Sequence, residues 1–215
     1  WCICIKEERR LSTASDGTPS IIASPGGNGG IHLGYNTFGV TGATFNVDAG
    51  SGGVIVYASL YNRANAVTTA STLTKTGTGE LTLRGTNTYT GATTVNQGIL
   101  ALVGSSSSSP HTIAAGAGIT AGDGTSGATG TLTFAAASAR LVVNALSTSS
   151  VSKLSCTTLT ATSGFTVDVL GTLTAGTYPI LVSTSGTPAP TLGVNTTGMS
   201  VSFSWSGTTL NMTIF

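Results

Sequence analysis

Charged residues are scarce in this sequence of 215 residues. Asp, Glu, Lys and Arg together make up 7% of it, and eight basic residues offset seven acidic ones to leave a net charge of +1. An average globular domain carries about 25% charged residues. Nucleic acids and anionic membrane surfaces are bound through clusters of Lys and Arg, so we expect neither as a partner.

Long hydrophobic runs are also missing. The longest apolar stretches are Gly53 to Ala58 and Ile99 to Val103, whereas a membrane-spanning helix needs about 20 apolar residues. No basic segment followed by an apolar one opens the sequence, as it would in a secretory signal. We therefore expect no membrane span.

Aromatic residues and cysteines are few. Phe, Trp and Tyr make up 6% of the sequence, without the clusters of Trp and Tyr typical of a strong sugar-binding platform, so surface glycans are a weaker expectation as partners. The three cysteines are Cys2, Cys4 and Cys156. They fit small buried side chains, a disulfide to Cys156, or a covalent link to a neighbouring molecule, and their spacing does not choose among these.

The residues that chemistry requires are too sparse for an active site. Beyond residue 16 the carboxylates are isolated from one another in sequence: Asp48, Glu80, Asp123 and Asp168. His32 and His111 have no acid or nucleophile beside them and are interpreted as turn or surface residues. No nucleophile-elbow, phosphate-loop or metal-ligand motif is present. The sequence predicts no catalytic residues, no cofactor and no bound metal.

Gly, Ser and Thr are abundant instead, at 96 of 215 residues, and the mean hydropathy of +0.32 favours a folded chain over a disordered one. Short β-forming segments recur between Gly, Asn and Ser, and no stretch has a helical period. We expect an all-β fold with negligible helix. The expected strands are Ala43–Val47, Gly53–Ala58, Ser71–Thr74, Glu80–Leu83, Ile99–Val103, Gly130–Phe134, Arg140–Val143, Thr157–Thr160, Phe165–Leu170, Tyr178–Val182, Val201–Trp205 and Leu210–Phe215.

Two features favour a single-stranded parallel β-helix, or β-solenoid, over a sandwich or a barrel. Thr and Asn dominate the turns, and stacked rungs about 4.8 Å apart would align like residues into ladders whose Thr and Ser cover the outside in place of charges. The second feature is a repeat unit at residues 72–104. Its Leu81 to Leu100 spacing predicts about 20 residues per rung.

This repeat unit contains Lys-Thr-Gly-Thr-Gly at 75–79, Leu-Thr-Leu at 81–83, Asn-Thr-Tyr-Thr-Gly at 87–91, Thr-Thr-Val at 93–95 and Gln-Gly-Ile-Leu at 97–100. It closely resembles the autotransporter-associated β-strand repeat, also called the passenger-associated transport repeat. The glycines should give the corners their backbone freedom, the asparagines suit turns, and the Leu and Val side chains should point inward. The structural residues of the motif are Gly77, Gly79, Leu81, Leu83, Asn87, Tyr89, Gly91, Val95, Gly98, Leu100 and Leu102, with Gly85 and Asn96 as further turn residues.

The resemblance implies a bacterial protein that is extracellular or exposed at the cell surface.

We divide the chain into an N-terminal segment, residues 1–16, and a solenoid body, residues 17–215, with a Ser-rich loop at 105–110. The N-terminal segment is apolar and then charged, so we expect it to dock on a copy of the chain or to cap its own first rung. Its candidate assembly residues are Trp1, Cys2, Ile3, Cys4, Ile5, Lys6, Glu7, Glu8, Arg9 and Arg10.

Three functions remain open. The first is a non-enzymatic, self-assembling subunit of a surface fibre, whose partners are copies of itself. The second is a monomeric adhesin or a passenger stalk, and the third, least favoured, is a polysaccharide-acting enzyme.

Overall fold

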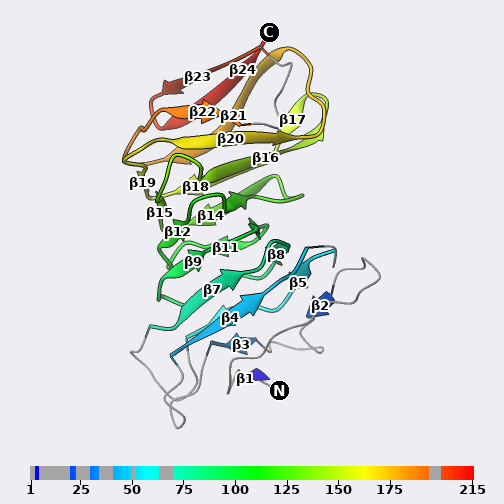
Figure 1. Ribbon diagram of the computed structural model, residues 1–215, viewed down its shortest axis with the longest axis vertical. Helices are drawn as coiled ribbons and strands as arrows, with labels where there is room; N and C mark the ends of the chain where they lie inside the picture. The colour runs from blue at the N-terminus through cyan, green and yellow to red at the C-terminus, as the bar shows by residue number, and fades with distance from the viewer. Residues whose placement is uncertain are drawn as a thin grey trace.

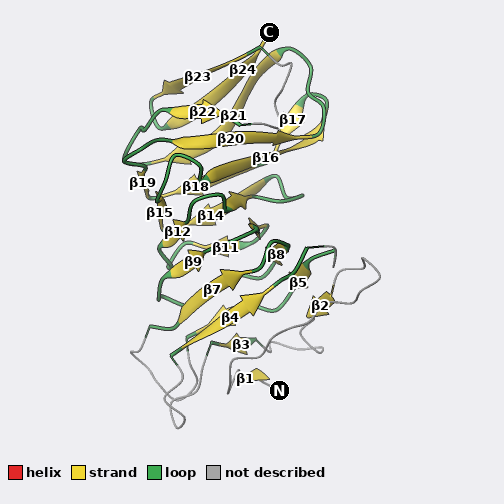
Figure 2. Ribbon diagram, viewed as in Figure 1, coloured by secondary structure: helices red, strands yellow, loops and turns green. Residues whose placement is uncertain are grey.

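In the computed structural model, the chain winds into stacked rungs of short parallel strands. The structure describes residues 3–4, 20–22, 30–33, 41–49, 52–62, 70–193 and 200–215. The described part contains strands, turns and bends and no helix (Figure 2). The all-β, parallel-solenoid prediction is confirmed. None of the described residues belongs to a helix long and apolar enough to cross a bilayer.

The strands form three faces along the length of the stack (Figure 1). Apart from the C-terminal end of the stack, parallel pairing joins each rung to the next, as in Leu81 with Leu100 and Leu100 with Ile119. The first face contains β2 (Ser20–Ile22), β5 (Val54–Val56), β8 (Glu80–Leu83), β10 (Ile99–Leu102), β13 (Gly118–Thr120), β16 (Arg140–Ser147), β20 (Phe165–Leu170) and β22 (Pro190–Leu192).

The second face is a sheet of six parallel strands that alternates with the first along the chain. Its members are β4 (Gly42–Asn46), β7 (Thr72–Thr76), β9 (Thr93–Val95), β12 (His111–Ile113), β15 (Thr131–Phe134) and β19 (Thr158–Thr160).

The third face begins with β1 (Ile3–Cys4), β3 (Ile31–His32) and β6 (Leu60–Tyr61), and it continues through backbone hydrogen bonds of residues 87–89. Beyond these residues it contains β11 (Ser105–Ser106), β14 (Ser126–Thr129), β18 (Lys153–Cys156), β21 (Gly176–Ser183), β24 (Thr209–Ile214) and β23 (Val201–Ser206).

The outside of the second face carries a ladder of threonines. Residue pairing aligns six of them, one per rung, in neighbouring strands, which agrees with the expectation that Thr replaces charge on the outer surface. The ladder consists of Thr44, Thr74, Thr94, Thr112, Thr133 and Thr160.

The inside of the stack holds apolar ladders because side chains alternate along each strand. In the first face Val54, Leu81, Leu100, Ile119 and Leu141 are aligned by the strand register, and all are at most 1% exposed. These ladders form one continuous hydrophobic core along the rod. Near its C-terminal end, Phe134 and Phe165 stack with ring centroids 4.4 Å apart.

Rung length varies along the rod. Leu81, Leu100 and Ile119 are spaced by 19 residues, as the repeat predicts, whereas the later partners Leu141 and Val167 are spaced by 26. The extra length in the later rung includes β17 (Ser150–Val151), which folds back antiparallel on the end of β16. The 20-residue estimate therefore holds for the repeat and not for the whole body.

Two expectations need correction. Ser105 to Pro110 was predicted as a loop, but Ser105 and Ser106 form β11 and pair with β14, because their small hydroxyl side chains find partners within the stack. The stack also does not end in parallel strands. At its C-terminal end β24 pairs antiparallel with both β21 and β23.

Candidate functional site

The repeat places a lysine inside the solenoid. Lys75 occupies the core ladder between Phe45 and Val95 and is 0% exposed. Its Nζ donates to the carbonyl oxygens of Thr76 at 2.7 Å, Gly77 at 2.6 Å and Gln97 at 3.2 Å. One ammonium therefore satisfies two carbonyls of its own corner and one of the next rung.

Burial lowers the pKa of Lys75 from 10.5 to about 8, and the negative charge of Asp48 opposes this change. A buried ammonium is stable only where its donors are used, and three carbonyls use the three donors of Lys75. Its bonds go to backbone carbonyls, so the geometry gives Lys75 a structural role in the corner.

Asn87 connects three rungs. Its side-chain oxygen accepts from the backbone N–H of Leu60 at 2.9 Å, and its amide nitrogen donates to the Gly85 carbonyl at 3.1 Å. Its own backbone N–H donates to Ser105 at 2.7 Å. This short segment has no regular strand, and the Asn87 side chain supplies the bonds that a strand would otherwise make.

The motif glycines lie against the backbone of the preceding rung. A Cβ at Gly77 would fall 2.3 Å from the Val47 carbonyl oxygen, and one at Gly98 would fall 2.3 Å from that of Gly79. Only these two motif glycines have positive φ, at 72° and 68°. Gly79, Gly85 and Gly91 are required by close approach, with carbonyl oxygens 2.3 to 2.6 Å from the Cβ position.

Beside the corner lies a buried seam of polar side chains, centred on Tyr89 and Thr93. The Tyr89 hydroxyl is 2.6 Å from Thr93 Oγ1, which is 2.9 Å from Ser109 Oγ, and Ser106 donates to Tyr89 at 3.3 Å. Burial raises the pKa of Tyr89, and these hydroxyls oppose the shift. Each hydroxyl has a partner, which makes the polar seam compatible with the core.

His111 belongs to the same seam, so its interpretation as a turn or surface residue is wrong. It is 1% exposed on β12, paired with Thr93 on one side and Leu132 on the other. Its Nδ1 donates to the Ser109 carbonyl at 2.9 Å, and burial lowers its pKa to about 4 although this bond opposes the shift. His111 is therefore neutral in the fold. His32 is half-buried on β3, with Nδ1 2.5 Å from the Asn62 carbonyl oxygen.

The remaining motif side chains lie in the core around this corner. The structure places these five inward and 0% exposed: Leu81, Leu83, Val95, Leu100 and Leu102.

Among the carboxylates, two form ion pairs with arginine. Asp168, 1% exposed, accepts from Arg140 at 3.0 Å, and the exposed Asp123 pairs with Arg84. Glu80 accepts from the hydroxyl of Thr82 at 2.9 Å. The described ranges contain no cluster of three or more His, Cys, Asp or Glu residues able to hold a metal ion.

The N-terminal assembly residues are mostly outside the described part of the chain. Trp1, Cys2 and residues 5–10 lie outside it, and Ile3–Cys4 form β1, paired parallel with Ile31–His32 of the same chain. Cys156 is a free, buried thiol on β18, and burial raises its pKa while a bond to Ser183 opposes the rise.

Comparison with known proteins agrees with this geometry. Residues 73–102 match a protein family described as passenger-associated-transport-repeat. Such repeats occur in secreted or surface-exposed autotransporter passengers, and the family is generally non-catalytic. No curated protein matches the chain at a significant level. The matched residues coincide with the corner built by Lys75, Asn87 and the motif glycines.

Proposed function

We propose that this chain is part of the stalk of a secreted or surface-exposed autotransporter passenger, and that its role is mechanical and non-catalytic. The observation that carries this proposal is the register of the matched repeat. Leu81 pairs with Leu100 in the next rung, Leu81 also pairs with Val54 in the preceding rung, and Leu100 pairs with Ile119 in the following one. The repeat therefore lengthens a rod, and the rod's length is what a stalk provides.

The chemistry of the rod supports the same role. Lys75, Asn87 and His111 donate or accept within the backbone and core of the stack. The outer threonine ladder presents hydroxyl and methyl groups without charge. A surface of this kind offers few groups for catalysis.

Surface labelling tests the proposal. In cells that make the complete gene product with Cys2, Cys4 and Cys156 replaced by serine, a single cysteine at the exposed Thr78 should react with a membrane-impermeant maleimide without lysis. A cysteine at Leu100, which is buried, serves as the control and should react only after denaturation. Labelling of Thr78→Cys only after lysis would overturn the proposed location.

One observation favours a second candidate, a head-to-tail fibre subunit. Because β23 is antiparallel to β24 and β24 is antiparallel to β21, β23 runs in the same direction as β21. In the described part, β1 and β23 are the terminal strands of the third face. A second copy could therefore continue this face by pairing its β1 with β23 of the first.

Deleting residues 1–12 separates this candidate from a capping role. If the N-terminal segment docks on a neighbour, the purified full chain forms fibres in negative-stain electron microscopy and the deletion yields a folded monomer. If the full chain is monomeric and the deletion causes aggregation, the segment is a cap on its own first rung and the fibre candidate is wrong.

A further inference from the structure

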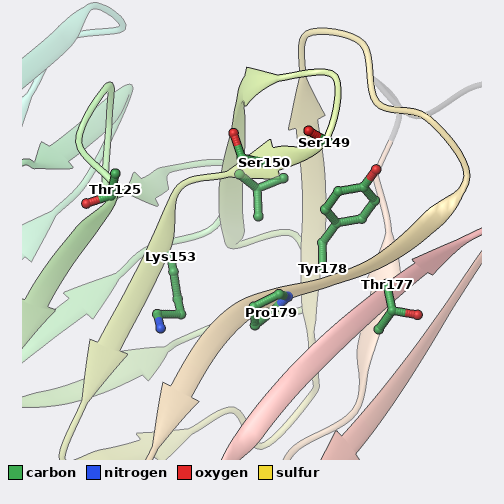
Figure 3. Close-up of a pocket in the computed structure, with 8 residues that line it drawn as sticks. Thr125, Ser149, Ser150, Lys153, Thr177, Tyr178 and Pro179 are labelled. Carbon is green, nitrogen blue, oxygen red and sulfur yellow. The ribbon is translucent and has the colours of Figure 1, made fainter.

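One groove on the rod combines an unpaired cation with a wall of hydroxyls. It has a volume of about 260 Å³ and lies where β14, β17, β18 and β21 come together (Figure 3). In Figure 3, Thr125 and Lys153 lie on one side of the opening and Tyr178 and Thr177 on the other. The lining residues are Thr125, Ser149, Ser150, Val151, Lys153, Thr177, Tyr178 and Pro179.

The groove occurs where the solenoid departs from its regular winding. One wall is the β16–β17 excursion, whose antiparallel pairing shifts register between Ala145 and Ser147. The other wall is β21, whose pairing with β24 shifts register between Pro179 and Leu181. Bulges re-aim side chains and are common next to functional sites.

Lys153 differs from the other described cations. Lys75 is held by carbonyls, Arg84 by Asp123 and Arg140 by Asp168. Within the described ranges, the ammonium of Lys153 makes no hydrogen bond and no ion pair, and its backbone N–H donates to the Thr125 carbonyl at 3.1 Å. Its half-buried ammonium lines the groove and is available to an anion.

The walls suit a sugar. Thr125, Ser149, Ser150 and Thr177 are exposed and carry hydroxyls that both donate and accept. Tyr178 is 5% exposed and its hydroxyl donates to the Thr174 carbonyl at 2.7 Å, so the exposed Pro179 supplies the apolar surface of the wall. Drug-sized ligands occupy pockets of about 300–1,000 Å³, so this smaller groove fits a single sugar ring.

From these features we infer that the groove binds an anionic saccharide, a sugar unit whose carboxylate or sulfate pairs with Lys153 and whose ring lies against Pro179. This site adds a ligand to a chain whose proposed role is otherwise mechanical, and it holds whether or not the chain is a stalk. An acidic peptide would use the cation but would leave the hydroxyl wall without matching partners, so the observations favour the saccharide.

Titration of the purified full chain, followed by NMR chemical-shift changes, tests the inference. The probes are a disaccharide containing glucuronic acid, the same disaccharide with a 6-sulfated glucose in place of the glucuronic acid, the uncharged disaccharide with plain glucose there, and a pentapeptide of glutamates. We expect one or both anionic sugars to bind with a millimolar Kd. Comparing the two Kd values shows whether the groove prefers a carboxylate or a sulfate. Binding of the uncharged disaccharide and of the peptide should be at least tenfold weaker.

Three variants locate the site. Lys153→Met should weaken binding at least tenfold and Lys153→Arg should keep it within about threefold, while Arg84→Met, at a half-buried cation outside the groove, should leave it unchanged. An unchanged urea midpoint for each variant shows that the fold is retained. The inference is wrong if neither anionic sugar binds, if the peptide binds as tightly as the sugars, or if Lys153→Met binds like the unmodified chain.

Discussion

Lys75 and Gln97 are 22 residues apart in sequence, and the ammonium of Lys75 donates to the carbonyl of Gln97 across 3.2 Å inside the solenoid. Because the same ammonium also bonds Thr76 and Gly77, a single side chain joins two successive corners. The lysine of the repeat motif is therefore buried and links successive rungs, and its removal should lower the free energy of unfolding.

Lys75→Met should lower the free energy of unfolding by about 2–4 kcal/mol. The methionine fills a similar volume, but it leaves three carbonyls without their donor, and each unsatisfied buried group costs about 1–3 kcal/mol before relaxation. Urea denaturation followed by circular dichroism measures the change. Lys153→Met, which removes a cation without such partners, is the control and should change stability by less than about 0.5 kcal/mol. Equal free energies of unfolding for the two variants would show that the hydrogen bonds of Lys75 do not stabilise the stack.

Gly98→Ala should destabilise the chain more than Gly116→Ala. Both glycines have positive φ, at 68° and 73°, so both substitutions carry the left-handed backbone penalty of about 1–2 kcal/mol. Only at Gly98 would the new Cβ meet the preceding rung, 2.3 Å from the Gly79 carbonyl oxygen; at Gly116 nothing lies within 4 Å. Overpacking adds about 1–3 kcal/mol. The difference between the two unfolding free energies isolates the close approach, and no difference would mean that backbone freedom alone selects Gly98.

His111 should make the fold sensitive to acid. Its pKa is about 4 in the fold and near 6.5 when unfolded, so the unfolded chain takes up a proton first as the pH falls. The contribution of neutral His111 to the free energy of unfolding is fully present above pH 6.5 and is lost as the pH falls from 6.5 to 4. By linkage, this loss amounts to about 3 kcal/mol.

The matched variant for this experiment is His111→Asn, whose side-chain amide can still donate to the Ser109 carbonyl but does not titrate. The carboxylates titrate in both proteins, so the difference between the two stability–pH curves reports His111. Parallel curves between pH 6.5 and 4 would show that His111 is not buried in its neutral form.

The Arg84–Asp123 and Arg140–Asp168 ion pairs should contribute differently to the free energy of unfolding. Arg84→Met breaks a pair with an aspartate whose side chain is 65% exposed, and it should cost less than about 1 kcal/mol. Arg140→Met leaves the Asp168 carboxylate, 1% exposed, without its cation and should cost about 3 kcal/mol or more. Urea denaturation at pH 7 measures both changes. Similar losses for the two variants would contradict the assigned difference in burial.

Sequence patterns predicted the parts of the fold that depend on local alternation. Glu80–Leu83 and Ile99–Val103 were predicted as strands, and the structure has strands with inward leucines at Glu80–Leu83 and Ile99–Leu102. The Leu81 to Leu100 spacing also gave the rung length of the repeat, because a parallel stack repeats its own period.

The polar interior could not be predicted in the same way. Lys75 and Ser106 face inward with partners from other turns of the chain, the Gln97 carbonyl and the Tyr89 hydroxyl. A hydropathy pattern contains no information on such long-range satisfaction. A Lys in an otherwise apolar alternating position, immediately before a Gly turn, was the available signal for the buried amine.

The groove was missed for a related reason. Ser149, Ser150 and Lys153 read as an ordinary polar connection, and Tyr178 joins them only because β21 lies beside β18 in the stack. The antiparallel ending was missed because β23 and β24 have the same alternation that a parallel rung would have.

Disulfide trapping tests most directly the central claim that the repeat forms consecutive parallel rungs. Thr74, Thr94 and Thr112 are aligned on the outside of the second face, one in each of three successive rungs. Adjacent rungs place Cα atoms about 4.8 Å apart, within disulfide range, and alternate rungs about twice as far, beyond it. With the native cysteines replaced by serine, the Thr74→Cys/Thr94→Cys protein should oxidise to an internal disulfide under mild conditions, and Thr74→Cys/Thr112→Cys should keep two free thiols. Efficient oxidation of the second pair, or failure of the first in a folded protein, would contradict the stacked register of the rungs.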